Sequence, residues 1–289
     1  MAARLMGYVS ASNTPTVVQQ SAYGRATGGI GSPTAVTISG TNYEYLTFTS
    51  TGTLTVTTAG WFDYCAVGGG GGALSMNAAG YAGGGGGAGQ VRFGSVYLSA
   101  NQTITIGAGG AFYNRNSDGF TQGGNTTVAA TSPFSQGAVG NACSDENTKP
   151  KTFAGGGNGS INGAAVISQT GSTFNGFAGG TSNASTNGGG GGGSTAVGGN
   201  GNSTTGGTGG AGTDISVFIG GSELRKGMGG GGGGSVTGGT AATGGVAGTT
   251  TTTSNNGNAN SGGGAGAGFG VLTTGAGGSG ICYIRWSVA

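Results

Sequence analysis

The chain contains no histidine and very little charge. Its 289 residues include 9 Lys and Arg and 7 Asp and Glu, so charged residues make up 6% and the formal net charge is +2. Without His, neither a Ser-His-Asp triad nor a Cys-His pair can be assembled, and the usual zinc clusters lack their ligands. The scattered charges imply neither nucleic acid nor an anionic membrane as a partner. We therefore expect no enzymatic activity, no cofactor and no metal site.

Proline, cysteine and long apolar runs are also scarce. With 4 Pro the chain cannot be collagen, which needs Pro or hydroxyproline above roughly 15%. Cys65, Cys143 and Cys282 are too dispersed for a disulfide framework, so we expect free, mostly buried thiols, with a Cys65 to Cys282 bridge as the alternative. No span approaches about 18 consecutive apolar residues, and the first residues lack the apolar core of a secretory signal. This predicts synthesis in a cytoplasm without membrane insertion.

Glycine is present in large excess, with 77 residues. Gly disfavours an α-helix, because each interior helical position costs about 1 kcal/mol relative to Ala. A flexible linker is the ordinary interpretation of so much Gly, but a hydrophobic fraction of 34% argues against it. No window has apolar residues at helical spacing, so the sequence predicts no α-helix.

Strand patterns occur near both ends of the chain. Residues 43–49 and 53–57 alternate aromatic or aliphatic side chains with Thr and predict a half-buried hairpin. Residues 61–67 and 281–286 form short apolar runs, and each adjoins a Gly run without an intervening turn residue. We therefore predict that the two ends of the chain share one small β-sandwich.

Gly clusters recur between these strands at unequal spacing, which excludes a solenoid of fixed period. A polyproline II arrangement fits them better, because that helix has three residues per turn and no internal hydrogen bonds. Several such helices side by side can satisfy one another's backbone groups, and only Gly allows so close an approach. Thr208 and Ala211, three residues apart, should then face outward at the rim, while Gly190 and Gly231 should be buried.

One Gly-rich segment departs from this period, because Ala265, Ala267 and Phe269 alternate with Gly at a spacing of two. That spacing favours an extended strand, so the conformation of this segment stays open. The predicted fold is all-β and irregular, with a small β-sandwich of N- and C-terminal strands enclosing a glycine-rich polyglycine II helix bundle. We expect residues 1–40 to be an N-terminal attachment and oligomerisation segment and residues 41–289 to be the glycine-rich domain.

The stretches between Gly runs carry aromatic and charged side chains but are too short and polar to form a core. Exposed aromatic rings on loops held by a rigid scaffold are typical of a binding surface. The alternative is that the rings fold back and plug the ends of the bundle. Aromatic rings stack on sugars or apolar surface, and Arg and Asn supply directional hydrogen bonds. The candidates for receptor binding are Tyr113, Arg115, Phe120, Phe174, Asn175 and Phe177.

The order of the motifs resembles a known family. The strings Trp61 to Ala73, Gly83 to Gly89, Leu98 to Gly110 and Gly277 to Trp286 look like the glycine-rich domain of bacteriophage tail proteins, tail-fibre tips and related surface proteins. The resemblance covers residues 41–289. A related architecture in tail-fibre adhesins of the T-even-like phages stacks polyglycine II helices and displays receptor-binding loops at their ends.

This resemblance implies a structural protein of the virion, made in the host cytoplasm, that acts as a tail-fibre or tail-tip adhesin. Its partners would be other virion proteins and a host cell-surface glycan or outer-membrane protein. The alternatives are a capsid decoration or head-fibre protein that acts as a spacer, and an ice-binding protein with flat Thr and Ala faces. Because fibre proteins usually close their symmetry by trimerisation, we expect a homo-oligomer, a trimer, docked through the segment that contains Thr16–Gln20.

Overall fold

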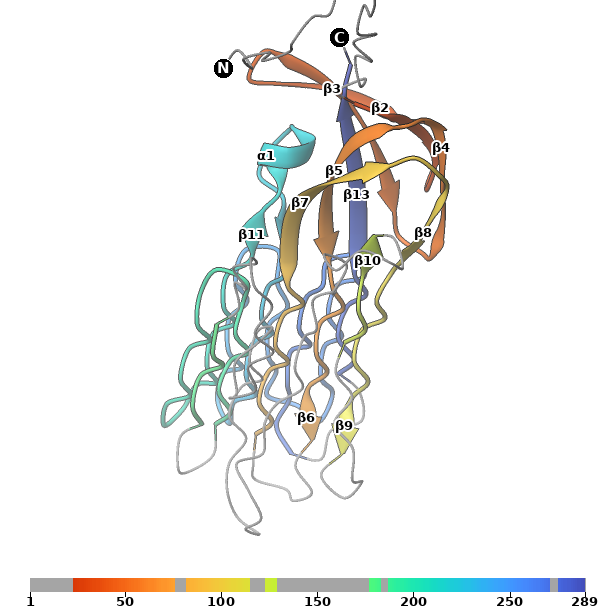
Figure 1. Cartoon of the computed structure of the whole chain (residues 1–289). Helices are drawn as coiled ribbons and strands as arrows, with labels where there is room; N and C mark the ends of the chain where they lie inside the picture. The colour runs from red at the N-terminus through yellow and green to blue at the C-terminus, as the bar shows by residue number, and fades with distance from the viewer. Residues whose placement is uncertain are drawn as a thin grey trace, which may run out of the picture.

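The chain folds into two parts, a β-sandwich and a bundle of glycine-rich helices that extends away from one end of it (Figure 1). The bundle continues the sandwich rather than lying inside it. The segment Thr16–Gln20, with its predicted role in oligomerisation, lies outside the described residues. The computed structural model describes residues 23–75, 82–114, 123–128, 177–182, 187–270 and 275–288.

The sandwich consists of two antiparallel sheets, and both ends of the described chain contribute to it, as predicted. The five-stranded sheet has the order β2-β3-β13-β5-β7, with β2 (Thr34–Ile38), β3 (Thr41–Phe48), β13 (Ile281–Ser287), β5 (Gly60–Val67) and β7 (Val91–Leu98). The four-stranded sheet has the order β1-β4-β8-β10, with β1 (Arg25–Gly28), β4 (Gly52–Thr58), β8 (Gln102–Thr105) and β10 (Thr127–Val128). Because β1 and β2 precede residue 41, the sandwich extends into the predicted N-terminal segment.

Apolar side chains from both sheets fill the space between them. Phe62 and Trp286 meet edge to face, with ring centroids 5.7 Å apart, and both are buried. Leu54 and Ile104 of the opposite sheet are fully buried in the same cluster. The indole nitrogen of Trp286 donates to Glu44 Oε2 at 3.1 Å, so the largest core side chain leaves no polar atom unsatisfied.

The predicted hairpin of residues 43–57 is wrong. The strands β3 and β4 follow each other in sequence, but β3 pairs with β2 and β13, whereas β4 pairs with β1 and β8. Phe48 and Leu54 are buried in one core although they come from different sheets. The chain crosses between the sheets here because each strand has one apolar face, and packing sheet on sheet buries both faces at once.

The two cysteines of the sandwich are free and buried, as predicted. They lie on neighbouring strands, but Cys65 is opposite Tyr283 and Cys282 is opposite Ala66. Their side chains therefore point to opposite faces of the sheet and cannot form a bridge. Burial raises the pKa of both thiols, which keeps them protonated. Cys143 lies outside the described residues.

The Gly runs form extended helices that hydrogen-bond to one another. The N–H groups of Gly69, Gly70 and Gly71 donate to three different segments of the chain, at 3.0, 2.9 and 2.8 Å. Gly68 and Gly71, three residues apart, both donate to the segment 87–90. A β-strand would return to the same neighbour every second residue, whereas a return every third residue is the period of polyproline II. The bundle is therefore made of polyglycine II helices, as predicted.

Gly occupies the interior of the bundle because a side chain would not fit. A Cβ atom at Gly190 would overlap the carbonyl oxygen of Thr208, and one at Gly231 would overlap that of Gly239. Both glycines are buried, as predicted. Neither has a positive φ, so the position requires the absence of a Cβ and not the conformational freedom of Gly.

The rim of the bundle shows the predicted threefold pattern of exposure. Along residues 206–212 every Gly is buried, Thr208 is exposed and Ala211 is half-buried. The side chains thus occupy the one edge of the helix that no neighbouring helix covers. Thr208 Oγ1 lies 3.0 Å from Thr240 Oγ1 of the adjoining helix, so the hydroxyl groups of the rim hydrogen-bond across helices.

The segment that the sequence left open belongs to the bundle too. The N–H groups of Gly264 and Ala267 donate to the carbonyl groups of Met228 and Gly231, so this segment also returns to its neighbour after three residues. Ala265 and Ala267 are both fully buried. Their methyl groups form a small apolar cluster with other side chains inside the bundle, which explains why Ala replaces Gly here.

A single helical turn, α1 (Ser216–Ile219), is the one helix among the described residues. It lies between the short strands β11 (Thr213–Asp214) and β12 (Arg225–Lys226), which pair with each other. Ile215 and Phe218 anchor it on the outer face of the five-stranded sheet. The prediction of an essentially helix-free chain is confirmed apart from this turn.

Asp214 holds the two ends of this insertion together. Its Oδ1 accepts hydrogen bonds from the N–H groups of Ser216 (2.9 Å) and Leu224 (3.0 Å), and its Oδ2 accepts one from the hydroxyl of Ser216 (2.8 Å). The bond from the Ser216 N–H lowers the pKa of the carboxyl most, and the bond from Leu224 adds to the effect. The ionised carboxylate accepts these three bonds more strongly than the protonated carboxyl does, so the conformation of the insertion is linked to pH.

Our first prediction concerns the interior of the bundle. Gly190→Ala should lower the free energy of unfolding by at least about 3 kcal/mol. The methyl group would displace the backbone at Thr208 and break the hydrogen bond from the Gly190 N–H to the Gly199 carbonyl. The measurement is urea unfolding followed by circular dichroism. Gly52→Ala is the matched control, because the atoms nearest to a Cβ there lie 3.8 Å away or more. Equal stability of the two variants would contradict a close-packed bundle.

Our second prediction concerns Asp214. Because its pKa is depressed, its contribution to the insertion is complete above the unfolded value of about 3.9 and is lost as the pH falls through the lower folded value. The amide NMR signals of Ser216 and Leu224 should therefore titrate with an apparent pKa below about 3.9. Asp214→Asn is the control and should remove this titration. A midpoint at or above the ordinary value would show that the three bonds do not form.

Candidate binding surfaces

The end of the bundle far from the sandwich is the first candidate surface. The short strands β6 (Leu74–Ser75) and β9 (Tyr113–Asn114) pair in parallel and mark this end in Figure 1. The backbone of the candidate Tyr113 therefore lies at the tip. The candidates Arg115, Phe120, Phe174 and Asn175 lie outside the described residues.

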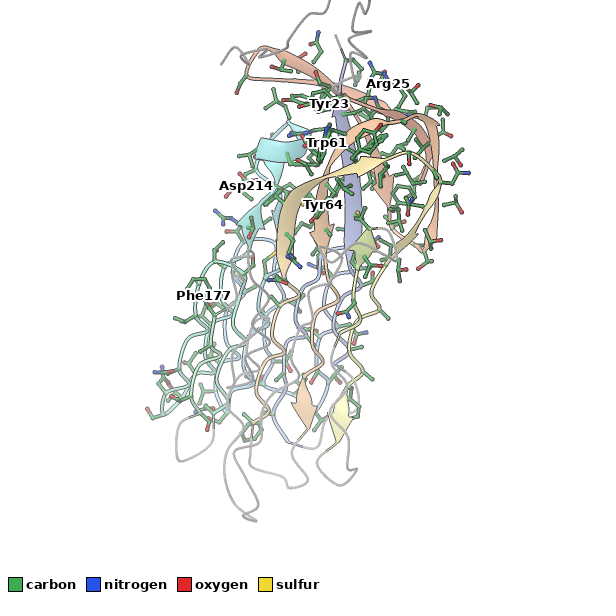
Figure 2. All side chains as sticks on the ribbon, in the orientation of Figure 1. Tyr23, Arg25, Trp61, Tyr64, Phe177 and Asp214 are labelled. Carbon is green, nitrogen blue, oxygen red and sulfur yellow. The ribbon has the colours of Figure 1, made fainter. Side chains whose placement is uncertain are left out.

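Phe177 lies elsewhere on the molecule. Its side chain is 39% exposed, and its N–H donates to Gly193 at 3.3 Å. The next residue, Ser194, bonds to Thr213 of β11, close to the sandwich. Figure 2 shows Phe177 on the flank of the bundle, well away from the tip. The structure thus does not bring Tyr113 and Phe177 together, and any binding that they contribute must come from two separate places.

Hydrogen bonds to the backbone hold the turns in the described part of the tip. Asn202 Oδ1 accepts hydrogen bonds from the N–H groups of Thr204 (2.9 Å) and Thr205 (2.8 Å), which forms a tight turn. The carbonyl of Thr204 accepts bonds from Val236 and Thr237 of the neighbouring turn, both at 3.1 Å. Val236 is 68% exposed. This part of the tip therefore presents fixed turns with short side chains.

A second candidate surface lies on the outer face of the five-stranded sheet. We call it the Trp61 surface and define it as Trp61 and Asp63 of β5 with the opposing Tyr97 and Ser95 of β7. The rings of Trp61 and Tyr97 meet edge to face with centroids 5.8 Å apart, and they are 45% and 38% exposed. Figure 2 shows Trp61 in the sandwich, near Tyr23 and beside α1.

A network of charged and aromatic groups fixes the polar half of the Trp61 surface. Asp63 Oδ1 accepts a hydrogen bond from the hydroxyl of Ser95 at 2.6 Å, and Asp63 Oδ2 forms an ion pair with Arg285 at 3.2 Å. The Arg285 guanidinium lies between the rings of Tyr43 and Phe218, at 4.2 and 4.1 Å from their centroids. It also donates to the carbonyl of Phe218 at 2.7 Å. The carboxylate is therefore held in one position by α1 and the sheet together.

Sequence reasoning missed this surface. The apolar run at residues 61–67 predicts a strand but does not by itself indicate which of its faces is exposed. Alternation carries the relevant signal, because Trp61 and Asp63 share one face while Phe62 and Tyr64 occupy the other. A large aromatic residue beside a carboxylate on the same face is the pattern that could have indicated an exposed site.

The described ranges contain no group of three or more His, Cys, Asp or Glu placed to hold a metal ion. Across the same residues, no helix has the length and apolar character needed to cross a membrane.

Comparison with known proteins identifies the family. Neither a curated protein nor a solved structure matches the chain. A family model described as the glycine-rich domain matches residues 47–287, from within β3 to the end of β13. This range includes the whole bundle and most strands of the sandwich, and on this basis the chain belongs to the glycine-rich domain family.

Proposed function

We propose that the protein is a structural component of a bacteriophage virion, a tail-fibre or tail-tip adhesin that contacts the host cell through loops between its Gly runs. One observation carries this proposal. The bundle projects from the sandwich in one direction, while both described termini lie in the sandwich (Figure 1). Tyr23 pairs with Trp61, and the N–H of Val288 donates to Asn42 at 2.9 Å.

This arrangement suits attachment at one end and recognition at the other. The bundle interior consists of backbone bonded to backbone, so it offers little with which to discriminate a ligand. The six candidate side chains for receptor recognition come from stretches where the chain leaves one Gly run and enters the next. A rigid support lowers the entropic cost of binding through such loops, because the scaffold is already ordered. The receptor would be a cell-surface glycan or an outer-membrane protein.

The sandwich end would then face the virion. We propose that other virion proteins bind there and that the protein forms a homotrimer docked through its N-terminal segment. A spacer on the capsid is the competing role, in which the tip would touch no receptor.

The test is adsorption of phage particles that carry Ala substitutions at the six candidate residues. We expect one or two of these substitutions to reduce the affinity for host cells about 30-fold, which corresponds to about 2 kcal/mol of binding free energy. The other substitutions should have small effects, because a few residues usually provide most of the binding energy of an interface. Tyr113, Arg115 and Phe120 form one set, and Phe174, Asn175 and Phe177 form the other. A loss at Tyr113 alone would indicate contact at the tip, and a loss at Phe177 alone would indicate contact on the flank.

Val217→Ala is a suitable control, because Val217 is 67% exposed on α1 and lies outside the bundle. The thermal stability of each purified variant separates misfolding from lost contact. If all six variants adsorb as the parent does, the adhesin proposal is wrong. Labelling of virions with a specific antibody under the electron microscope would then decide between tail and capsid.

A further inference from the structure

The Trp61 surface combines exposed aromatic rings with hydrogen-bonding groups. Two exposed rings on adjoining strands lie beside a carboxylate and a hydroxyl, all on one face of the sheet. We propose that this surface is a binding site for a neutral saccharide, one hexopyranose unit in size. This site lies on the sandwich, away from the tip of the bundle, and does not rest on the proposed role in adsorption.

The rings provide the first half of the argument. Because Trp61 and Tyr97 meet edge to face at 74°, the pair covers at most one of its own four ring faces. Their exposed fractions, 45% and 38%, confirm that substantial ring area is open to water. The face of an aromatic ring carries negative charge density, which attracts the weakly positive C–H groups on one side of a pyranose ring. An exposed indole is thus suited to stack on a sugar.

The polar groups provide the second half. A carboxylate has about four acceptor positions, and the described contacts of Asp63 with Ser95 and Arg285 use two of them. The remaining lone pairs can accept hydrogen bonds from sugar hydroxyl groups, and such bonds to an ionised group are strong. Arg285 balances the charge of Asp63, so the site favours a neutral ligand over an anionic one. The packing of Arg285 between two rings means that Asp63 need not be ordered on binding.

The spacing of these groups sets the size of the ligand. Neighbouring strands lie about 4.8 Å apart, and residues two apart on a strand are separated by about 6.8 Å. The four side chains therefore outline an area close to that of one pyranose ring. The side chains of Asp63 and Arg285 are only 19% and 13% exposed, so a ligand can reach the carboxylate only at its open edge. A saccharide hydroxyl group is small enough to donate a hydrogen bond there.

Tryptophan fluorescence tests this proposal directly, because the chain has 2 Trp and Trp286 is only 1% exposed. Quenching by acrylamide therefore reports on Trp61. The probes are glucose, galactose and N-acetylglucosamine, each titrated to about 100 mM, well above a millimolar Kd. We expect at least one to protect Trp61 from acrylamide in a saturable manner.

Three variants test whether the sugar that protects Trp61 binds at the Trp61 surface. Binding of the same sugar, measured by saturation-transfer NMR, should be lost in Trp61→Ala and weakened about fivefold in Ser95→Ala, which removes one hydrogen-bonding group. Val236→Ala, at an exposed apolar residue of the bundle tip, is the matched control and should bind as the parent does.

Three results would overturn the proposal. The first is that none of the three sugars protects Trp61 from acrylamide, and the second is that the Trp61→Ala variant binds the sugar as the parent does. The third is that protection depends on the protein concentration and not on the sugar concentration. The last result would show that a second copy of the chain covers the surface. Adsorption by the parent phage is independent of all three, so failure of this site leaves the adhesin proposal to its own test.

Discussion

Every backbone N–H and C=O group inside the bundle has to find its partner on another run, because a polyproline II helix makes no hydrogen bonds within itself. No single run can therefore fold alone, and the bundle forms as a set. The same demand explains the composition, since helices close enough to exchange these bonds leave no space for a Cβ at the positions between them. The excess of Gly is thus a packing requirement, and each of these residues carries the high entropic cost of ordering Gly.

The sandwich supplies what the runs lack, a core of apolar side chains that fixes their alignment. Val67, the last residue of β5, pairs with Ile281, the first residue of β13. Both segments continue from there into the bundle, where the Gly70 N–H donates to the Gly278 carbonyl. The register of the sheet therefore passes directly into the register of the helices. Neighbouring helices run in either direction. Gly85 and Ala88 donate to Gly189 and Gly192, which lie in a parallel segment, whereas Gly83, Gly86 and Gly89 donate in reverse order to the antiparallel segment 262–268.

The sequence predicts the bundle well because its period is local. Two Gly followed by a larger residue places that residue on the open edge of a threefold helix, and Thr208 is found there. The sequence predicts the tertiary partners less well. Whether β3 turns back on β4 or crosses to the other sheet depends on which apolar faces meet, which alternation alone does not encode. The Trp61 surface depends in the same way on the register that sets Tyr97 opposite Trp61, 36 positions along the chain.

The bundle and the candidate binding surfaces depend on different chemical groups, main-chain groups in the bundle and side chains at the surfaces. The bundle is held mainly by main-chain hydrogen bonds, and the side chains of Asn187 and Asn202 add further bonds at its turns. Among the described residues, a network of charged and aromatic side chains lies on the sandwich instead, where Arg285 joins the sheet to α1 through two rings and a carbonyl. Substitutions at exposed turn positions whose side chains form no hydrogen bond, such as Val236, can alter what the surface contacts without disturbing the helices beneath.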